Sequence, residues 1–204
     1  MMEQTKLNEI SDRLREIEKE LAEELEKHLH EKQKQFRYTV EKGKVLFDKS
    51  ISALHKHSRV GVWSYIRNAR ILHILSAPVI YSLFFPFLLV DISVSIYQQV
   101  CFRIYGMPMV RRSDYVLIDR HHLAYLNPIE KFNCMYCGYV NGVIGYVREI
   151  AARTEQYWCP IKHAARTPDP HRLNHGFSDY GDAEAYRSRA QILRNELNEL
   201  EGSG

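Results

Sequence analysis

Cysteine and histidine residues form two closely spaced pairs in the second half of this 204-residue chain. Cys134 and Cys137 are separated by two residues, and Cys159 and His163 by three. Three thiolates and one imidazole make a complete tetrahedral donor set for zinc. The spacing within each pair also suits a structural zinc site. The pattern therefore predicts that Cys134, Cys137, Cys159 and His163 bind one zinc ion.

The segment between the two pairs sets a condition on this site. A straight helix over residues 138–158 would hold the pairs about 30 Å apart, because a helix rises about 1.5 Å per residue. One ion cannot bridge that distance, so the chain must fold back. Gly138, Gly142 and Gly145 are the expected break points. We therefore expect a small helical metal-binding domain over residues 106–182.

Carboxylates near the pairs leave a redox or hydrolytic site open as an alternative. Two facing helices could bring carboxylate, thiolate and imidazole groups together around iron. Glu149, Glu155 or His122 would then supply ligands or act as general acid and base. Glu149 and Glu155 could instead lie on a solvated face, paired with Arg148 and Arg153. Cysteines without a metal would be buried side chains, a redox pair or a disulfide. Whether the protein is an enzyme stays open.

The element before these pairs is strongly apolar. Residues 71–90 contain no Asp, Glu, Lys or Arg. Twenty such residues in a helix match the thickness of a bilayer core, and Trp63 and Tyr105 flank the stretch as interfacial aromatics do. A buried core helix is the alternative, but little else in the chain could cover so large an apolar surface. We therefore expect a lipid bilayer as a partner.

Two prolines and an aspartate make the path through the bilayer less simple. Pro78 and Pro86 both favour a kink, and the apolar stretch resumes after Asp91. Residues 71–102 are too few for two full spans. A re-entrant hairpin is favoured over a single span, with basic residues on both sides and both ends cytoplasmic. Asp91 would lie near the turn, as a functional group or as a marker of the lipid boundary.

The N-terminal part has the pattern of a coiled coil. Apolar residues recur at alternating three- and four-residue steps and continue after a stutter. The like charges of Glu16 and Glu20, four apart, disfavour a helix standing alone. We expect a self-associating coiled coil over residues 3–35, with an amphipathic helix packed on its own chain as the alternative. Residues 36–60 are expected to stay helical, with Gly43 as a weak point. The apolar positions are Leu7, Ile10, Leu14, Ile17, Leu21, Leu25 and Leu29.

These elements predict a mainly α protein with four parts. They are a coiled-coil arm (1–60), a membrane-associated segment (61–105), the Cys/His domain (106–182), and a C-terminal helix and tail (183–204) whose cap is Asp182. A net charge of +3 is too small to indicate nucleic acid as a partner. The resulting hypothesis is a membrane-anchored zinc scaffold that forms homo-oligomers. The alternative is a metalloenzyme at the membrane interface, with iron in place of zinc.

Two motifs carry a resemblance. The run from Asp119 through the Cys134-Met-Tyr-Cys137 knuckle, with the later Cys159-Pro-Ile-Lys-His163, resembles a family of bacterial membrane-associated proteins with no assigned activity. The resemblance covers roughly residues 65–185 and implies only a bacterial context. Together with the apolar segment and its basic flanks, this predicts a bacterial inner membrane, with the soluble parts in the cytoplasm. The proline-containing apolar segment also resembles that of monotopic phosphoglycosyl transferases. Their adjacent Asp-Glu pair does not follow the segment here, so their activity is not inferred.

Overall fold

The computed structural model describes residues 2–41 and 44–199 and is mainly helical, as predicted. The chain divides into two compact units. The first unit contains Met1–Val60 with His122–Asn127, and the second contains Gly61–His121 with Pro128–Gly204. Because His122–Asn127 belongs to the first unit, the units do not follow the four expected segments.

The first unit begins with α1 (Met2–Phe36), followed by strands β1 (Tyr38–Glu41) and β2 (Lys44–Phe47) and by α2 (Lys49–His57). The strands pair antiparallel with Tyr38 opposite Phe47, and the centroids of those two rings lie 5.5 Å apart. The expectation of continuous helix over residues 36–60 is therefore wrong. Arg37 has a φ of 50°, which a right-handed helix cannot contain. The predicted weak point, Gly43, lies outside the described residues.

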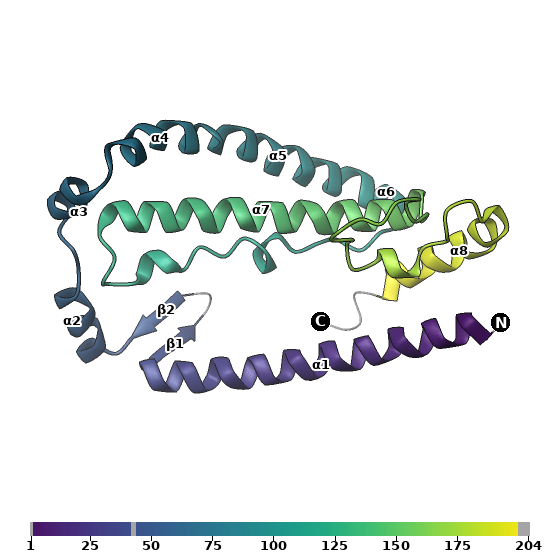
Figure 1. Ribbon diagram of the computed structural model, residues 1–204, viewed down its shortest axis with the longest axis horizontal. Helices are drawn as coiled ribbons and strands as arrows, with labels where there is room; N and C mark the ends of the chain where they lie inside the picture. The colour runs from purple at the N-terminus through teal and green to yellow at the C-terminus, as the bar shows by residue number, and fades with distance from the viewer. Residues whose placement is uncertain (1, 42–43, 200–204) are drawn as a thin grey trace. The chain divides into compact units, whose positions relative to one another are not determined.

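The second unit begins with α3 (Val62–Asn68), α4 (Ile71–Ser82) and α5 (Phe84–Tyr97). A π-helical turn (Gln98–Phe102) and the short α6 (Arg103–Tyr105) extend α5. α4 and α5 follow one another in a single arc (Figure 1), because Leu83 between them keeps helical backbone angles. The expected re-entrant hairpin is therefore wrong. Pro86 does not reverse the chain, since the third residue of a helix has no intrahelical N–H bond to lose.

Helix α7 (Pro128–Trp158) lies beside α4 and α5 and runs in the same direction. Tyr81 of α4 contacts Asn133 near the start of α7, and Tyr97 of α5 contacts Thr154 near its end. A parallel pair requires a crossing connection, and residues 106–121, which we call the return segment, supply most of it. They run back along α7 as irregular backbone with two 3-10 turns, Arg112–Asp114 and Arg120–His122.

The glycines of α7 do not break the helix. They lie at steps of four and three residues, and the return segment passes over them. A Cβ atom on Gly138 would lie 2.9 Å from the carbonyl oxygen of Leu117, and one on Gly142 would lie 2.7 Å from that of Tyr115. The expected fold-back at these residues is therefore wrong. Glycine is needed here because it permits close backbone contact, not because it ends the helix.

The core of the second unit forms where the end of α5, the return segment, α7 and α8 (Ala183–Glu199) meet. The side-chain amide of Gln156 on α7 donates to the carbonyl oxygen of Leu193 on α8 at 2.7 Å. The predicted cap of α8 is confirmed, because the backbone N–H of Ala185 donates to Oδ1 of Asp182 at 2.8 Å. The buried core side chains are Phe102, Met107, Val110, Tyr146, Ile150 and Leu197.

Candidate membrane-binding surface

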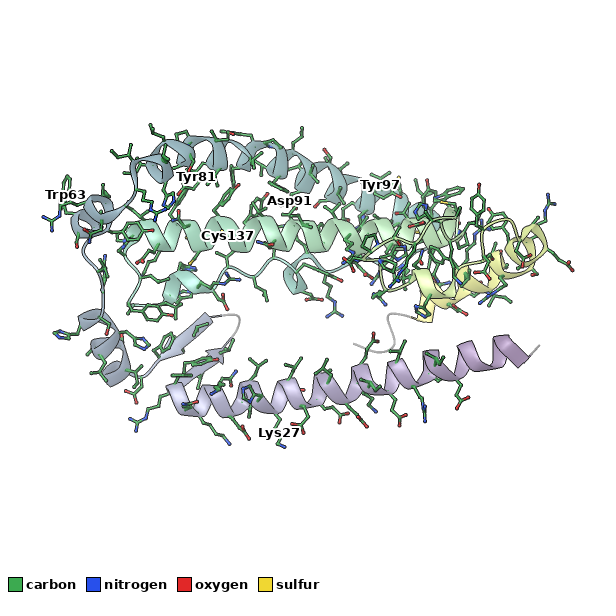
Figure 2. The ribbon with its side chains drawn as sticks, viewed as in Figure 1. Lys27, Trp63, Tyr81, Asp91, Tyr97 and Cys137 are labelled. Carbon is green, nitrogen blue, oxygen red and sulfur yellow. The ribbon has the colours of Figure 1, made fainter. Side chains whose placement is uncertain are left out.

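One side of α4 and α5 exposes an apolar surface, which we call the outer face. Its side chains extend away from α7 (Figure 2). Their exposed fractions range from 49% to 75%, which is high for large apolar residues. Such an extended apolar surface on a folded protein marks an interaction site. The outer face consists of Ile71, Leu72, Leu75, Val79, Phe85, Leu89, Ile92, Ile96, Val100 and Ile104.

The helical run that carries this surface is long. Within the described residues, Ile71–Tyr105 is the one helix that is long and apolar enough to cross a membrane. It has 35 residues, which corresponds to about 52 Å at about 1.5 Å per residue. Length and composition are weak evidence by themselves, since buried helices of soluble proteins can share them. The arrangement of polar groups on the opposite side of the helix adds independent information.

The inner face of α5 carries an ion pair whose carboxylate is buried. Asp91 is 6% exposed and lies between α5 and α7 in Figure 2. Arg112 of the return segment donates to it twice, from Nε to Oδ1 at 2.9 Å and from a terminal nitrogen to Oδ2 at 2.7 Å. The hydroxyl of Tyr139 on α7 donates to Oδ2 at 3.0 Å. Hydrogen bonding to Asp91 raises the pKa of Arg112, so the cation is retained. The pKa of Tyr139 is raised by burial and by its bond to Asp91.

Other polar groups on the inner face also bond to the rest of the unit. Tyr136 on α7 donates from its hydroxyl to the carbonyl oxygen of Ile80 at 2.7 Å. Gln98 donates to the hydroxyl of Tyr146 at 3.0 Å and accepts from the backbone N–H of Val110 at 2.8 Å. The buried side chains of this run thus include the polar Asp91 and Gln98, while its large apolar side chains are exposed, together with the small polar Ser82 and Ser93. This is the reverse of a surface helix in a soluble protein.

Residues at both ends of the outer face suit a membrane–water interface. Trp63 of α3 is 85% exposed and projects from the second unit (Figure 2). Arg70 immediately precedes α4, and Arg103 begins α6; both are exposed. Indole rings favour the headgroup region, and arginine is attracted to anionic lipid. The apolar surface is thus bordered by groups that prefer the interface.

The four predicted zinc ligands do not come together. Cys134 and Cys137 lie on α7, Cys159 follows its last residue, and His163 lies in an exposed segment beyond. Because α7 is continuous, Cys137 and Cys159 are separated by about 33 Å of helix. Within the described residues, no group of three or more His, Cys, Asp or Glu side chains could hold a metal ion. The residues present do not fit one zinc or iron ion, and metal binding stays a prediction.

Glu149, a predicted acid–base candidate, is buried in an ion-pair cluster. Arg153 donates to it from Nε at 2.8 Å, and Arg172 donates from Nε at 3.0 Å. Burial alone would raise the pKa of Glu149, but hydrogen bonds and charge from Arg172 and Arg153 outweigh it and lower the pKa below its ordinary value. Both carboxylate oxygens are thus engaged by guanidinium groups. The pairing of Glu149 with Arg153 agrees with the alternative interpretation of the sequence. The burial of Glu149 and its second partner, Arg172, were not predicted.

The other two candidates are also separate from any common site. Glu155 lies 2.9 Å from Nε2 of His171, measured from Oε2. His122 is exposed, at the end of the 3-10 turn Arg120–His122, and belongs to the first unit. Glu149 and Glu155 are therefore each held by a different basic partner.

The Asp91–Arg112 pair is the feature that sequence reasoning missed. A carboxylate within an apolar stretch requires a cation or several donors. Arg112 belongs to the first pair of adjacent basic residues after the apolar segment, so the sequence did contain a suitable cation for Asp91. The sequence could not show which arginine returns to the aspartate, because 21 positions separate them. Tyr139, 48 positions away, carried no signal.

Comparison with known proteins finds no matching family model, no matching curated protein and no matching solved structure.

Proposed function

We propose that the protein is a membrane-binding scaffold that lies on one leaflet of a bilayer through the outer face of α4 and α5. The observation that carries the proposal is the reversed polarity of this helical run. Asp91 and Gln98 bond inward to α7 and the return segment, and large apolar side chains dominate the outer face. Burying a large apolar side chain contributes about 1.5–3 kcal/mol. Transfer of the whole face into lipid is therefore strongly favourable.

The packing of the unit favours an orientation in the plane of the membrane over a span. If Ile71–Tyr105 crossed the bilayer, α7 and the return segment would enter the hydrocarbon with it. α7 carries Arg148 and Glu149, and the return segment has irregular backbone. Irregular backbone facing lipid does not occur in the hydrocarbon region. The run is also about 52 Å long, against about 30 Å of hydrocarbon.

In this orientation each polar group has a suitable environment. The outer face reaches the acyl chains, while Trp63, Arg70 and Arg103 lie at the level of the headgroups. α7 and the return segment stay on the water side, where Arg148 remains hydrated and the ion-pair cluster around Glu149 stays outside the hydrocarbon. We assign this surface to the cytoplasmic leaflet of a bacterial inner membrane, because the sequence resemblance implies a bacterial context and basic residues flank the apolar segment on both sides. Exposed arginines then favour vesicles with anionic lipid, and salt weakens their contribution.

A scaffold role is favoured over a metalloenzyme by the state of the carboxylates. Glu149 is held by two arginines, and Glu155 is held by His171. A general base must reach the proton that it abstracts, and these oxygens are engaged by partners of the protein itself. The proposal requires no reaction and no metal.

Depth measurements test both the contact and the orientation. Nitroxide labels are placed singly at Leu75, Leu89 and Val100, in full chains whose four native cysteines are serine. The label at Arg148, on the exposed side of α7, is the control. An in-plane helix places the three outer-face labels at one depth below the phosphates of anionic vesicles, with the control in water. A span predicts depths that differ by tens of ångströms, because 25 residues rise about 38 Å.

The two possible failures are distinct. Labels at three clearly different depths would overturn the in-plane orientation while retaining membrane contact. Labels that stay in water in the presence of vesicles, with protein that is folded by circular dichroism, would overturn the membrane proposal itself.

A further inference from the structure

Helix α1 exposes a second apolar surface, which has a different form. Six apolar side chains between positions 10 and 29 have exposed fractions of 54–58%. They form one narrow stripe, and the remaining positions of α1 are mostly charged. A stripe of this width matches the seam of a coiled coil, in which each helix covers the stripe of another. The six residues are Ile10, Leu14, Ile17, Leu21, Leu25 and Leu29.

The order of leucine and isoleucine along the stripe specifies the number of helices. A three-residue step leads from position a to position d, and a four-residue step leads from d to the next a. Leu7, Leu14 and Leu21 are therefore at a, and Ile10 and Ile17 are at d. Two-stranded coils prefer the reverse order, with isoleucine at a and leucine at d. Leucine at a with isoleucine at d shifts the preference to trimers and tetramers.

The physical reason lies in the stiffness of a β-branched side chain. Isoleucine has one strongly preferred χ1 rotamer in a helix. At position d of a parallel dimer, the Cα–Cβ bond points straight at the neighbouring helix, and that rotamer packs poorly. In a four-stranded bundle the directions at a and d are exchanged, so isoleucine fits at d and leucine at a. We propose that α1 forms a parallel four-stranded coiled coil with three other copies of this chain.

Residues beside the seam fit the same assembly. Arg13 is at position g, and Glu18 is at position e of the next heptad. In a parallel bundle each Arg13 faces Glu18 of the neighbouring chain, which gives one attractive pair at every interface. After Leu21, the four-residue steps to Leu25 and Leu29 are the stutter noted above, so the a and d positions are defined over residues 7–21. A second copy of α1 is thus complementary in both charge and shape.

The assembly also has a consequence for membrane binding, which rests on the proposed function. Each chain contributes one outer face, so a tetramer carries four. Linked weak sites bind with an avidity that exceeds the affinity of one site, often by about 100-fold or more. The number of copies would then determine how firmly the protein is held on a vesicle.

The experiment is the mass of the full chain in detergent, measured by sedimentation equilibrium under density-matched conditions. We expect four chains of 24.0 kDa each. The decisive variant exchanges the two residue types without a change in composition: Leu7→Ile, Ile10→Leu, Leu14→Ile and Ile17→Leu. Isoleucine at a with leucine at d should convert the tetramer to a dimer. Lys19→Gln, on the outer side of α1, is the control and should remain tetrameric.

Each result decides the proposal. A wild-type trimer, dimer or monomer overturns it, and so does a swap variant that stays tetrameric. A second variant, Leu14→Glu with Ile17→Glu, should give monomers that keep the thermal transition of the second unit. If that variant remains tetrameric, the chains assemble elsewhere and the proposal fails. Because the mass is measured in detergent, it does not depend on whether the outer face binds lipid.

Discussion

The two apolar surfaces of this protein, the stripe on α1 and the outer face of α4 and α5, are both exposed, but they differ in width and in neighbouring charge. The stripe is one residue wide in each turn and runs between glutamates, lysines and arginines. The outer face has no charged residue between positions 71 and 90. Charges beside the stripe would oppose entry into lipid, whereas a partner helix leaves them in water. Exposure alone therefore does not identify the partner of an apolar surface. The width of the surface and the charges of the neighbouring residues do.

The largest effects are expected when charge is placed on either surface. Leu89→Glu with Ile96→Glu should reduce vesicle binding by at least about 100-fold, because two apolar contacts are lost and two carboxylates must be buried. The helix content should be unchanged. Co-sedimentation with anionic vesicles and circular dichroism measure the two quantities.

The matched variant places the same charges on α1, as Ile17→Glu with Leu21→Glu. It should lose the oligomer and its avidity but keep the vesicle binding of a single chain. Leu117→Glu, at an exposed apolar position of the return segment, should bind as wild type. Equal loss of binding in the α1 and outer-face variants would contradict the division of roles between the two surfaces.

The next largest effect is expected at the ion pair between Asp91, on the inner face of α5, and Arg112. Arg112→Ala leaves Asp91 buried without its cation, so the free energy of unfolding should fall by about 2 kcal/mol. This figure is below the range for a fully buried pair, since the arginine is partly exposed. The adjacent Arg111→Ala should change the free energy of unfolding by less than about 0.5 kcal/mol, because Arg111 is an exposed surface residue. Thermal unfolding in detergent compares the two, and similar losses would contradict the assigned importance of the Asp91 pair.

The glycines of α7 provide a third comparison. In Gly142→Ala the new methyl group would lie 2.7 Å from backbone atoms of Tyr115 and Val116, so a loss of about 1–3 kcal/mol is expected from the forced shift. In Gly145→Ala it would lie 3.2 Å from a ring atom of Tyr115, a side chain that can move. That variant should be nearly neutral, because alanine favours a helix by about 1 kcal/mol over glycine. Denaturant unfolding measures both, and a destabilising Gly145→Ala with a neutral Gly142→Ala would contradict the position of the return segment.

Acid should weaken the second unit through Glu149. Its pKa is lowered in the folded protein, so its contribution to stability is present above the unfolded value near 4.5 and is lost as the pH falls through the folded value. The melting temperature of the wild type should therefore fall more steeply below about pH 4.5 than that of Glu149→Gln. Arg148→Gln, which removes an exposed pair with Asp169, should follow the wild type. Parallel curves for wild type and Glu149→Gln would show that this carboxylate is not coupled to folding.

The smallest effect is expected at the predicted zinc ligands. Cys137→Ser with His163→Ala should change the free energy of unfolding by less than about 0.5 kcal/mol, because both side chains are exposed and far apart along the chain. Elemental analysis of the purified protein is the companion measurement. One zinc per chain that is lost in this variant, together with the fold, would overturn the separation of the ligands described above.

Neighbouring residues were enough to predict several of these elements. The steps of three and four in α1, the uncharged stretch after Ile71 and the cap at Asp182 are patterns within a few turns of chain. Each can be read without knowing what packs against it. The paired strands β1 and β2 were missed because their apolar residues also fit a helical face, and the break in the helix at Arg37 depends on a single backbone angle.

The sequence by itself determined which surfaces are apolar and how their residues repeat, because composition and spacing are properties of the chain alone. Only the tertiary structure decided what the glycines of α7 do, which arginine neutralises Asp91, and that Cys137 and Cys159 stay apart. These outcomes depend on groups separated by 20 to 50 positions. Their contact is determined by how helices and the return segment pack, which local patterns do not encode.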